Sequence, residues 1–441
     1  MSTLTTPARD ADANPSAGRR IPRIAETDAR ELYLNATIHE LGRRAHEICE
    51  SLHPEPYRTY VVDRNINYAN WCTATCIFCD FKADVPGVNT RRNDLPPGYT
   101  LTYEQIGRKI EELLAIGGTQ ILMQGGLVPP DGPAGLPFAW YLDLMRFIKR
   151  HYPSVHVHAF SPPEIWALAQ VFGMSVRDVL LRLHEAGLDT VPGGGGEILA
   201  DRVRTRIAQG KTLTSEWLEV MRQAHAIGMK TSCTMMFGHI ETFDERIEHL
   251  RLLRELQDES LARNNDGGFS AFICWPFQPG NTPLGRWKPL AADGKNRQNV
   301  ETSSSQTLDP AAKRTGPLDR ASRDAVTEAV EAGFDSPRRP LNDGNHLLLA
   351  DAHEYLTMQA LARIYLDNIP NVQASWVTMG PKIGQLALFF GANDMGSVMM
   401  EENVVSAAGT TYQLNEVDIR RLIADAGWQP RKRDYYYRPL E

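Results

Sequence analysis

The regular alternation of short apolar runs with amphipathic stretches is the feature that most constrains how this chain folds. The expected strands cover residues 60–63, 120–123, 155–160, 189–191, 230–236, 269–275, 372–376 and 397–400, and helical patterns lie between them. Strands that alternate with helices pair in parallel. Eight such units predict an α/β fold that closes into a (β/α)8 TIM-type barrel, with helical extensions at the N- and C-termini.

Polar and glycine-rich motifs follow almost every expected strand. They are residues 124–126 (Gln-Gly-Gly), 161–164 (Ser-Pro-Pro-Glu), 193–196 (four glycines), 237–241 (Phe-Gly-His-Ile-Glu) and 276–281 (Pro-Phe-Gln-Pro-Gly-Asn). The strand ends of a parallel barrel share one face, and active sites are built on that face. The sequence therefore predicts a single site at the C-terminal mouth of the barrel.

Three cysteines follow the first expected strand. Cys72, Cys76 and Cys79 have Cx3Cx2C spacing. Thiolates this close together can hold one iron–sulfur cluster through three of its four irons, whereas a cluster held by protein alone takes four cysteines. The open iron is then a binding position, as open coordination sites usually are. A zinc site and unconnected core cysteines are the alternatives, but zinc favours CxxC pairs and four ligands, and no second pair follows.

Two of the motifs allow both a structural and a functional interpretation. The run that contains Gly194 and Gly195 is either a flexible turn or backbone that passes close beneath a ligand, with Glu197 as a candidate polar contact. It has neither the P-loop nor the Rossmann pattern. Glu164, three residues after Ser161, is either an acid in the first turn of a helix or a partner for the hydroxyl or amino groups of a cofactor.

Acidic residues and a histidine near the expected mouth are candidates for proton transfer. His239 and Glu241 would serve in this role, or would be solvated loop residues. Glu402 is a further candidate; with Asn403 it would instead hold a ribose or cap a helix.

Other histidines and cysteines are expected to be structural. His156 and His158 alternate along an expected strand, and we interpret them as residues of the core or the barrel interior. Cys233 and Cys274 lie in apolar strands and are expected in the core.

Composition limits the classes of protein that this chain can belong to. The 441 residues carry a formal net charge of −7, which argues against a broad surface for nucleic acid. No apolar run is long enough for a membrane span, and residues 1–28 have no signal-peptide pattern and are expected to form a disordered tail. Residues 29–441 are expected to form one domain, with a polar surface insertion at about 288–342. A thiolate-held cluster needs reducing surroundings, so we expect a cytoplasmic protein.

The cysteine loop closely resembles that of the radical S-adenosylmethionine (radical SAM) enzymes. The resemblance implies a 4Fe–4S cluster whose open iron binds S-adenosylmethionine, and an electron donor such as flavodoxin or ferredoxin. It places Phe78 against the adenine of the cofactor. It also implies that Gly125 and Gly126 let backbone groups approach the methionine moiety, although Leu127 follows where the family usually has Glu. A tight turn remains the alternative for this pair.

Seven further motifs are similar to those of the cyclic dehypoxanthinyl futalosine synthase family. They include Thr190-Val-Pro-Gly-Gly-Gly-Gly-Glu-Ile, Trp275-Pro-Phe-Gln-Pro-Gly-Asn-Thr and Gly391-Ala-Asn-Asp-Met-Gly-Ser-Val-Met-Met-Glu-Glu-Asn. The resemblance implies a nucleoside-derived substrate, dehypoxanthine futalosine, that is cyclised in menaquinone biosynthesis. The alternatives are the sister aminofutalosine and deazaflavin-precursor synthases or, from another class, a zinc-stabilised barrel that hydrolyses or binds. The sequence does not indicate an oligomeric state.

Overall fold

The computed structural model describes residues 22–85, 97–128, 134–286, 341–401, 403–409 and 412–440. Three sequence expectations lie outside these residues: most of the N-terminal tail, nearly all of the insertion at 288–342, and Glu402. No helix within the described ranges is long and apolar enough to cross a membrane.

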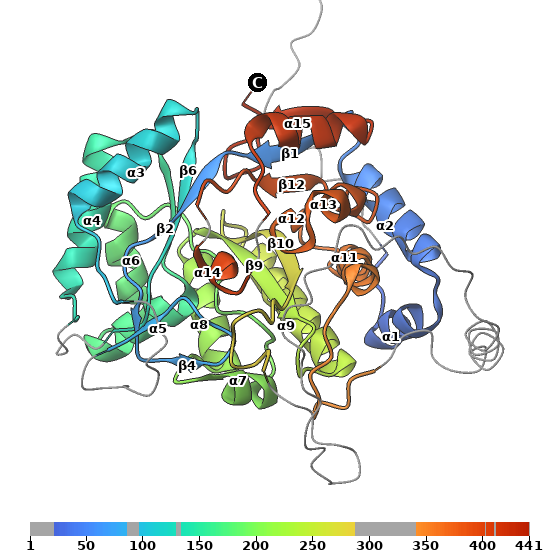
Figure 1. Ribbon diagram of the computed structural model, residues 1–441, viewed down its shortest axis with the longest axis horizontal. Helices are drawn as coiled ribbons and strands as arrows, with labels where there is room; N and C mark the ends of the chain where they lie inside the picture. Colours follow the sequence, from blue (N-terminus) through green and yellow to red (C-terminus); the bar gives the residue numbers. More distant parts are fainter. Residues whose placement is uncertain are drawn as a thin grey trace, which may run out of the picture.

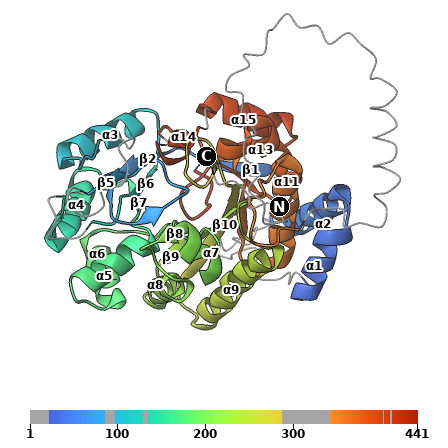
Figure 2. The same cartoon turned by 60° about the horizontal axis from the view of Figure 1, so that its bottom comes forward.

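The parallel strands form a closed ring surrounded by helices (Figures 1 and 2). One sheet has the order β13-β1-β12-β11-β10-β9 and a second has the order β2-β6-β7. Single parallel bridges, His158 to Thr190 and Val191 to Thr231, join β7 to β9 through residues 190–191. The described residues therefore contain the eight expected wall positions, counting β1 and β2 as one, and the predicted (β/α)8 barrel is confirmed.

The strands and helices have the following bounds. The wall strands are β1 (Tyr57–Val61), β2 (Asp63–Asn67), β6 (Gln120–Gln124), β7 (His156–Ala159), β9 (Lys230–Phe237), β10 (Gly268–Pro276), β11 (Asn371–Gln373) and β12 (Asp394–Ser397). The outer helices are α3 (Tyr103–Ala115), α4 (Phe138–His151), α5 (Pro162–Val171), α6 (Val176–Ala186), α8 (Thr214–Ala226), α9 (Phe243–Ala262), α11 (Ala352–Tyr365) and α13 (Pro381–Ala387). The extensions are α1 (Glu26–Asn35), α2 (Ile38–Leu52) and α15 (Glu416–Asp425).

Several boundaries differ from those expected from the sequence. Helix α1 begins at Glu26, within the stretch expected to be a disordered tail. The last wall strand is β12, which ends at Ser397 where the sequence predicted a strand to begin. Trp376 begins the short helix α12 (Trp376–Met379) instead of ending a strand. The first strand is longer than expected and is interrupted at Val62.

This interruption lets the two halves of the first strand pair with different partners. β1 pairs with β12 on one side and with the C-terminal strand β13 (Gln429–Lys432) on the other, whereas β2 pairs with β6. Strand β13 has no strand pattern in its sequence, Gln-Pro-Arg-Lys. It is a parallel strand beside β1, at the end of the barrel opposite the mouth.

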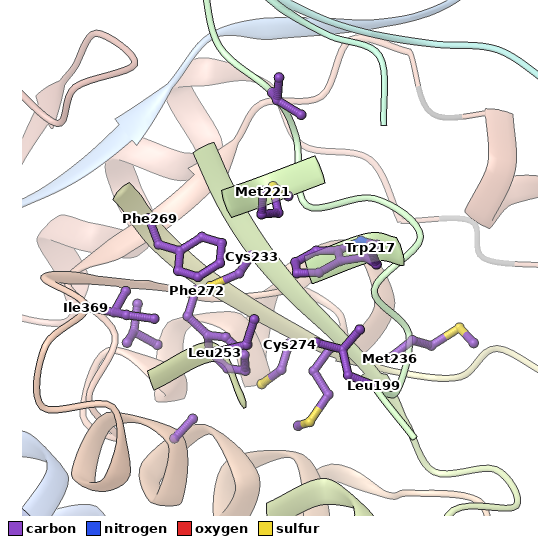
Figure 3. Packing of buried hydrophobic residues seen from close by; sticks show 14 of the residues in the cluster. Leu199, Trp217, Met221, Cys233, Met236, Leu253, Phe269, Phe272, Cys274 and Ile369 are labelled. Carbon is purple, nitrogen blue, oxygen red and sulfur yellow. The ribbon is translucent and has the colours of Figure 1, made fainter. Parts of the chain in front are cut away.

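Apolar packing lies between the strands and the helices. Figure 3 shows Cys233 and Cys274 among Trp217, Phe272 and Leu253, and both cysteines are fully buried. Their predicted place in the core is confirmed. The loss of apolar surface to water in this layer is the main favourable contribution to folding.

Candidate active site

The cysteine loop lies at the carboxyl end of β2 and is fixed by short pieces of strand. Cys72 is in β3 (Trp71–Cys72), which pairs with β5 (Ala83–Asp84). Cys76 is in β4 (Thr75–Cys76), which pairs with β8 (Ala208–Gln209) beside helix α7 (Asp201–Ile207). The backbone N–H of Ile77 donates to Ile207 over 2.8 Å, and Leu284 donates to Ile77 over 2.8 Å. The loop is therefore held by two segments that follow other wall positions, one after residues 190–191 and one after β10.

The three thiols lie near one another, and the surroundings disfavour the free thiolate at two of them, Cys72 and Cys76. Burial raises the pKa of Cys76 to about 12, and the neighbouring Cys72 and Cys79 act in the same direction. Burial also raises the pKa of Cys72, although the N–H of Leu127, 3.4 Å from its Sγ, opposes this. Buried thiols of this kind become thiolates when a metal binds them, so the donor set fits an iron–sulfur cluster.

No group of three His, Cys, Asp or Glu side chains in the described part of the chain converges closely enough to hold a single metal ion. A four-iron cluster does not require such convergence, because each thiolate binds a different iron.

The glycine pair after β6 supports the cysteine loop. A Cβ on Gly126 would lie 1.9 Å from the carbonyl oxygen of Trp71 and 2.8 Å from Cβ of Cys72. A Cβ on Gly125 would lie 2.3 Å from the ring of Tyr68. Only glycine fits at these two positions, because their backbone packs closely against Tyr68 and the cysteine loop. A tight turn alone would not require glycine at both.

Glu164 is buried and is surrounded by protein donors. Its carboxylate accepts hydrogen bonds from Ser161 N (2.8 Å), Ser161 Oγ (2.6 Å), Gly125 N (2.9 Å) and the hydroxyl of Tyr68 (2.8 Å). Glu164 is thus the acid of the capping box that begins α5. It also ties the glycine pair to α5, so these contacts favour the structural alternative.

The glycine run lies where several strand ends meet. A Cβ on Gly194 would lie 2.4 Å from Nε2 of Gln124 and 3.3 Å from Cβ of Ser161. Gly195 has a φ of +77°, and its Cβ position is 2.4 Å from Pro163 and 3.3 Å from Cε of Lys211. These contacts leave no room for side chains, so the run is a packed element of the site.

Beside the run, a buried ion pair lies close to the cysteines. Lys211 Nζ is 2.7 Å from Oε1 of Glu197 and 5.4 Å from the ring centre of Phe78. Burial disfavours the charged lysine, but the negative charge of Glu197 and its hydrogen bond with Lys211 outweigh this effect and raise the pKa of Lys211. The other oxygen of Glu197, Oε2, has no hydrogen-bond partner among the described residues; Arg204 Nη1 lies 3.7 Å away.

His239 and Glu241 are fully buried, so the expectation that they are solvated loop residues is wrong. Glu241 accepts hydrogen bonds from the backbone of Gly238 (2.6 Å) and His239 (2.9 Å) and from Arg246 Nε (2.8 Å). Nε2 of His239 lies 3.0 Å from the carbonyl oxygen of Met236. Their role in proton transfer stays a prediction, and the contacts of Glu241 favour a structural role.

Beyond β12, Glu402 lies outside the described residues. The neighbouring Asn403 begins α14 (Asn403–Ala407), and its Nδ2 donates to Oδ1 of Asn67 at the end of β2 over 3.2 Å. This contact brings the last strand's loop to the same mouth as the cysteine loop.

Sequence reasoning missed some residues of the site. Lys211 and Tyr68 are single residues without a motif of their own, and only the pairing of β4 with β8 and the packing of Gly125 reveal them. Lys211 follows a short glycine-containing turn, which is the one signal that the sequence offers.

A parallel barrel whose mouth carries a three-cysteine loop defines the class of the radical SAM enzymes. The model of the radical SAM superfamily matches residues 66–253, and that of the CofH/MqnC C-terminal region matches residues 345–441. The chain belongs to the radical SAM superfamily, in the group that carries the CofH/MqnC C-terminal region. Enzymes of this superfamily use a 4Fe–4S cluster and S-adenosylmethionine.

Particular relatives cover almost the whole chain. A cyclic dehypoxanthine futalosine synthase from Halalkalibacterium halodurans is 39% identical over 94% of this chain and 91% of its own length. The enzyme of the same name from Streptomyces coelicolor is 34% identical, over 95% and 86%. A 5-amino-6-(D-ribitylamino)uracil–L-tyrosine 4-hydroxyphenyl transferase from Methanosarcina barkeri is 35% identical, over 92% and 88%.

Solved structures share the fold. The FeFe-hydrogenase maturase HydG from Carboxydothermus hydrogenoformans superposes with a TM-score of 0.60 at 13% identity, covering 94% of this chain and 78% of HydG. Methylornithine synthase, PylB, gives a TM-score of 0.57 at 15% identity, covering 94% and 95%. These likenesses support the barrel architecture alone.

Proposed function

We propose that this protein is a radical SAM cyclase that converts dehypoxanthine futalosine to cyclic dehypoxanthine futalosinate in menaquinone biosynthesis. The observation that carries the proposal is the 39% identity with a cyclic dehypoxanthine futalosine synthase over 94% of the chain. The cysteine loop at the barrel mouth supports the same chemistry. A reductant such as flavodoxin or ferredoxin would supply the electrons.

In this proposal Cys72, Cys76 and Cys79 would hold the 4Fe–4S cluster. When bound, the cluster and S-adenosylmethionine supply a carbon-centred radical that removes a hydrogen atom from the substrate ribose. The loop is held by β8 and by the N–H of Leu127 on Cys72. These contacts fix the thiols before the cluster binds, and such preorganisation is what a reactive centre requires.

The residues around the loop would bind the amino-acid part of S-adenosylmethionine. Lys211 carries a positive charge, and Oε2 of Glu197 has no partner among the described residues. The two groups are complementary to a carboxylate and an ammonium group. Phe78, beneath Lys211, offers an aromatic face for the adenine.

Ring closure onto the aromatic ring of the substrate needs the reacting atoms to be close and water to be excluded. The glycine run places no side chain of its own beside Gln124 at the end of β6, and the amide of Asn67 lies at the end of the adjacent strand β2, where it pairs with Gln124 in the strand register. The neutral side-chain amides of Asn67 and Gln124 are suited to hydrogen-bond the hydroxyl groups of a sugar. The residue that takes the final proton is best sought among His239, Glu241 and Glu402.

The test is an anaerobic assay of the reconstituted protein with S-adenosylmethionine, a reductant and dehypoxanthine futalosine. We expect the cyclised product to form together with 5′-deoxyadenosine. Parallel reactions contain 5-amino-6-(D-ribitylamino)uracil with L-tyrosine, the substrates in the name of the Methanosarcina barkeri relative. Turnover of that pair without turnover of dehypoxanthine futalosine would disprove the proposed substrate.

A further inference from the structure

The C-terminal tail enters the barrel from the end opposite the mouth. After β13, Arg433 is buried and its Nη2 donates to Oδ1 of Asp394, on β12, over 3.0 Å. The same carboxylate accepts a hydrogen bond of 2.6 Å from Thr59 on β1. The guanidinium lies 3.8 Å from the ring centre of Tyr437. Buried charges are stable only when paired in this way, so the tail is firmly anchored.

Tyr435 extends from this anchor into the bore of the barrel. Its ring stacks on His156 with centres 4.5 Å apart and planes 7° apart, and it lies 4.7 Å from His158. Its hydroxyl is 3.1 Å from Oγ of Ser270. His156 and His158 are on β7 and Ser270 is on β10, and these strands are not neighbours in the wall. A side chain that contacts both strands must lie in the interior of the barrel.

His158 continues the contact toward the glycine run. Its Nδ1 is 2.8 Å from Oγ1 of Thr190, and its Nε2 is 3.3 Å from Oγ of Ser232. Burial holds the pKa of His158 well below its usual value. A neutral imidazole has one donor and one acceptor nitrogen, which two hydroxyl groups can satisfy.

Ser232 completes the chain. Its hydroxyl accepts a hydrogen bond of 3.0 Å from the N–H of Gly193, the first residue of the glycine run. The carbonyl of Gly193 accepts a hydrogen bond of 2.6 Å from Oγ1 of Thr234. Both backbone groups of Gly193 are therefore held by β9, and the Ser232 hydroxyl is in contact with His158.

We propose that Tyr435 is a positioning residue: acting through His158 and Ser232, the C-terminal tail holds the glycine run in place for the reaction at the mouth. The inference rests on the proposed function, which places that run beside the reacting groups. Glycine residues have the most conformational freedom to lose. A run of four needs external restraint to keep one geometry. Trp217 and Arg204 restrain the carbonyls of Gly194, Gly195 and Gly196 directly, and the tail adds restraint at Gly193 from the far end of the barrel.

The first test needs no cofactor. Amide hydrogen exchange of the cluster-free protein is followed in peptides covering residues 190–199. In Tyr435→Ala we expect exchange there to be at least about fivefold faster, the size of a coupling of about 1 kcal/mol. Tyr435→Phe, which keeps the ring, should stay near wild type. Leu440→Ala alters an exposed tail residue and is the control.

A second variant covers the case in which Tyr435→Ala does not fold. Ser232→Ala removes the acceptor of the Gly193 N–H with a small change in volume, and should also accelerate exchange at 190–199. Unchanged exchange in this peptide, in either variant once folded, would overturn the inference.

The last readout separates the inference from the proposed function. In the anaerobic assay, Tyr435→Ala should form at least about threefold more 5′-deoxyadenosine per cyclised product, because a loosened run holds the substrate less well. A merely destabilising change would lower both products together and keep the ratio. Absence of cyclised product from wild type contradicts the proposed function, whereas an unchanged ratio in Tyr435→Ala contradicts only the inference.

Discussion

Lys211 donates to Glu197 over 2.7 Å at a point where the glycine run, Phe78 and the cysteine loop meet. Both side chains are largely buried, with 16% and 9% of their surface exposed. Glu197 adopts a left-handed backbone conformation, with a φ of +30°. Strained backbone of this kind persists only where the surroundings fix it, and it concentrates at functional sites.

The first prediction concerns this pair. Lys211→Met leaves the Glu197 carboxylate buried without its nearest cation, and breaking a buried pair costs about 3–5 kcal/mol. We expect a loss of about 3 kcal/mol in the free energy of unfolding, the lower end of this range, because Arg204 Nη1 stays 3.7 Å from Oε2 of Glu197. Guanidinium unfolding of the cluster-free protein measures the loss. The double variant Lys211→Met with Glu197→Gln should recover part of it; a purely additive result would show that the two side chains are not coupled.

The second prediction concerns the cysteines. Cys76→Ala should reduce bound iron and acid-labile sulfide after anaerobic reconstitution to less than about a quarter of wild type, because three thiolates are the minimum set for a cluster with one open iron. 5′-Deoxyadenosine formation should vanish. Cys274→Ala is the matched control, since this buried thiol on β10 donates to Oε1 of Gln359 over 3.2 Å, away from the loop. Full iron content in Cys76→Ala would rule out the assignment.

The third prediction concerns Gly126. An added Cβ would lie 1.9 Å from a backbone oxygen of Trp71, which cannot rotate away. Gly126→Ala should therefore displace the cysteine loop. Iron incorporation and activity should each fall at least about tenfold, which corresponds to a free-energy difference of about 1.4 kcal/mol or more. Gly173→Ala is the control: its φ is +61° and nothing lies within 4 Å of the new Cβ. That change should cost about 1 kcal/mol of stability and leave iron content unchanged.

The order of the barrel and the cysteine loop could be predicted from sequence because both are local patterns. Apolar runs report strands, and ligand spacing reports the cluster loop. Strand β12 was placed too late because its sequence, Asp-Met-Gly-Ser, contains two residues that disfavour strands, while the Val-Met-Met that follows resembles one. The strand predicted at 189–191 is present only as two single bridges, made by residues 190 and 191. It is therefore the shortest of the wall positions described.

Non-local pairing limits prediction elsewhere. Strand β13 contains Pro430 and two charged residues, and only its partner, more than 300 positions earlier in the chain, makes it a strand. The fixed position of Tyr435 inside the bore depends on that pairing. His156 and His158 were correctly assigned to the barrel interior from their alternation along the strand, but their contact with the tail has no local signal.

The buried carboxylate of Glu241 leads to the last prediction, on acid stability. Burial alone would raise the pKa of Glu241, but His239, Arg246 and the N–H of Gly238 outweigh it and hold the pKa well below its usual value. In the unfolded chain a glutamate titrates near about pH 4.3. Since the folded-state pKa is the lower one, the unfolded chain binds more protons in the acid range. The stabilisation is therefore complete above the unfolded pKa and decreases as the pH falls toward the folded pKa.

Glu241→Gln tests this relation because it removes the charge and keeps the size. Arg246 retains Glu354 as a partner, so we expect a loss of about 3 kcal/mol in the free energy of unfolding at pH 7, the lower end for a broken buried pair. Below about pH 4.3 the gap between wild type and variant should narrow by about 1.4 kcal/mol for each pH unit. Glu185→Gln, on the exposed side of α6, should follow wild type at every pH. A gap that stays constant from pH 7 to pH 3 would show that the Glu241 carboxylate does not gain its stability from ionisation.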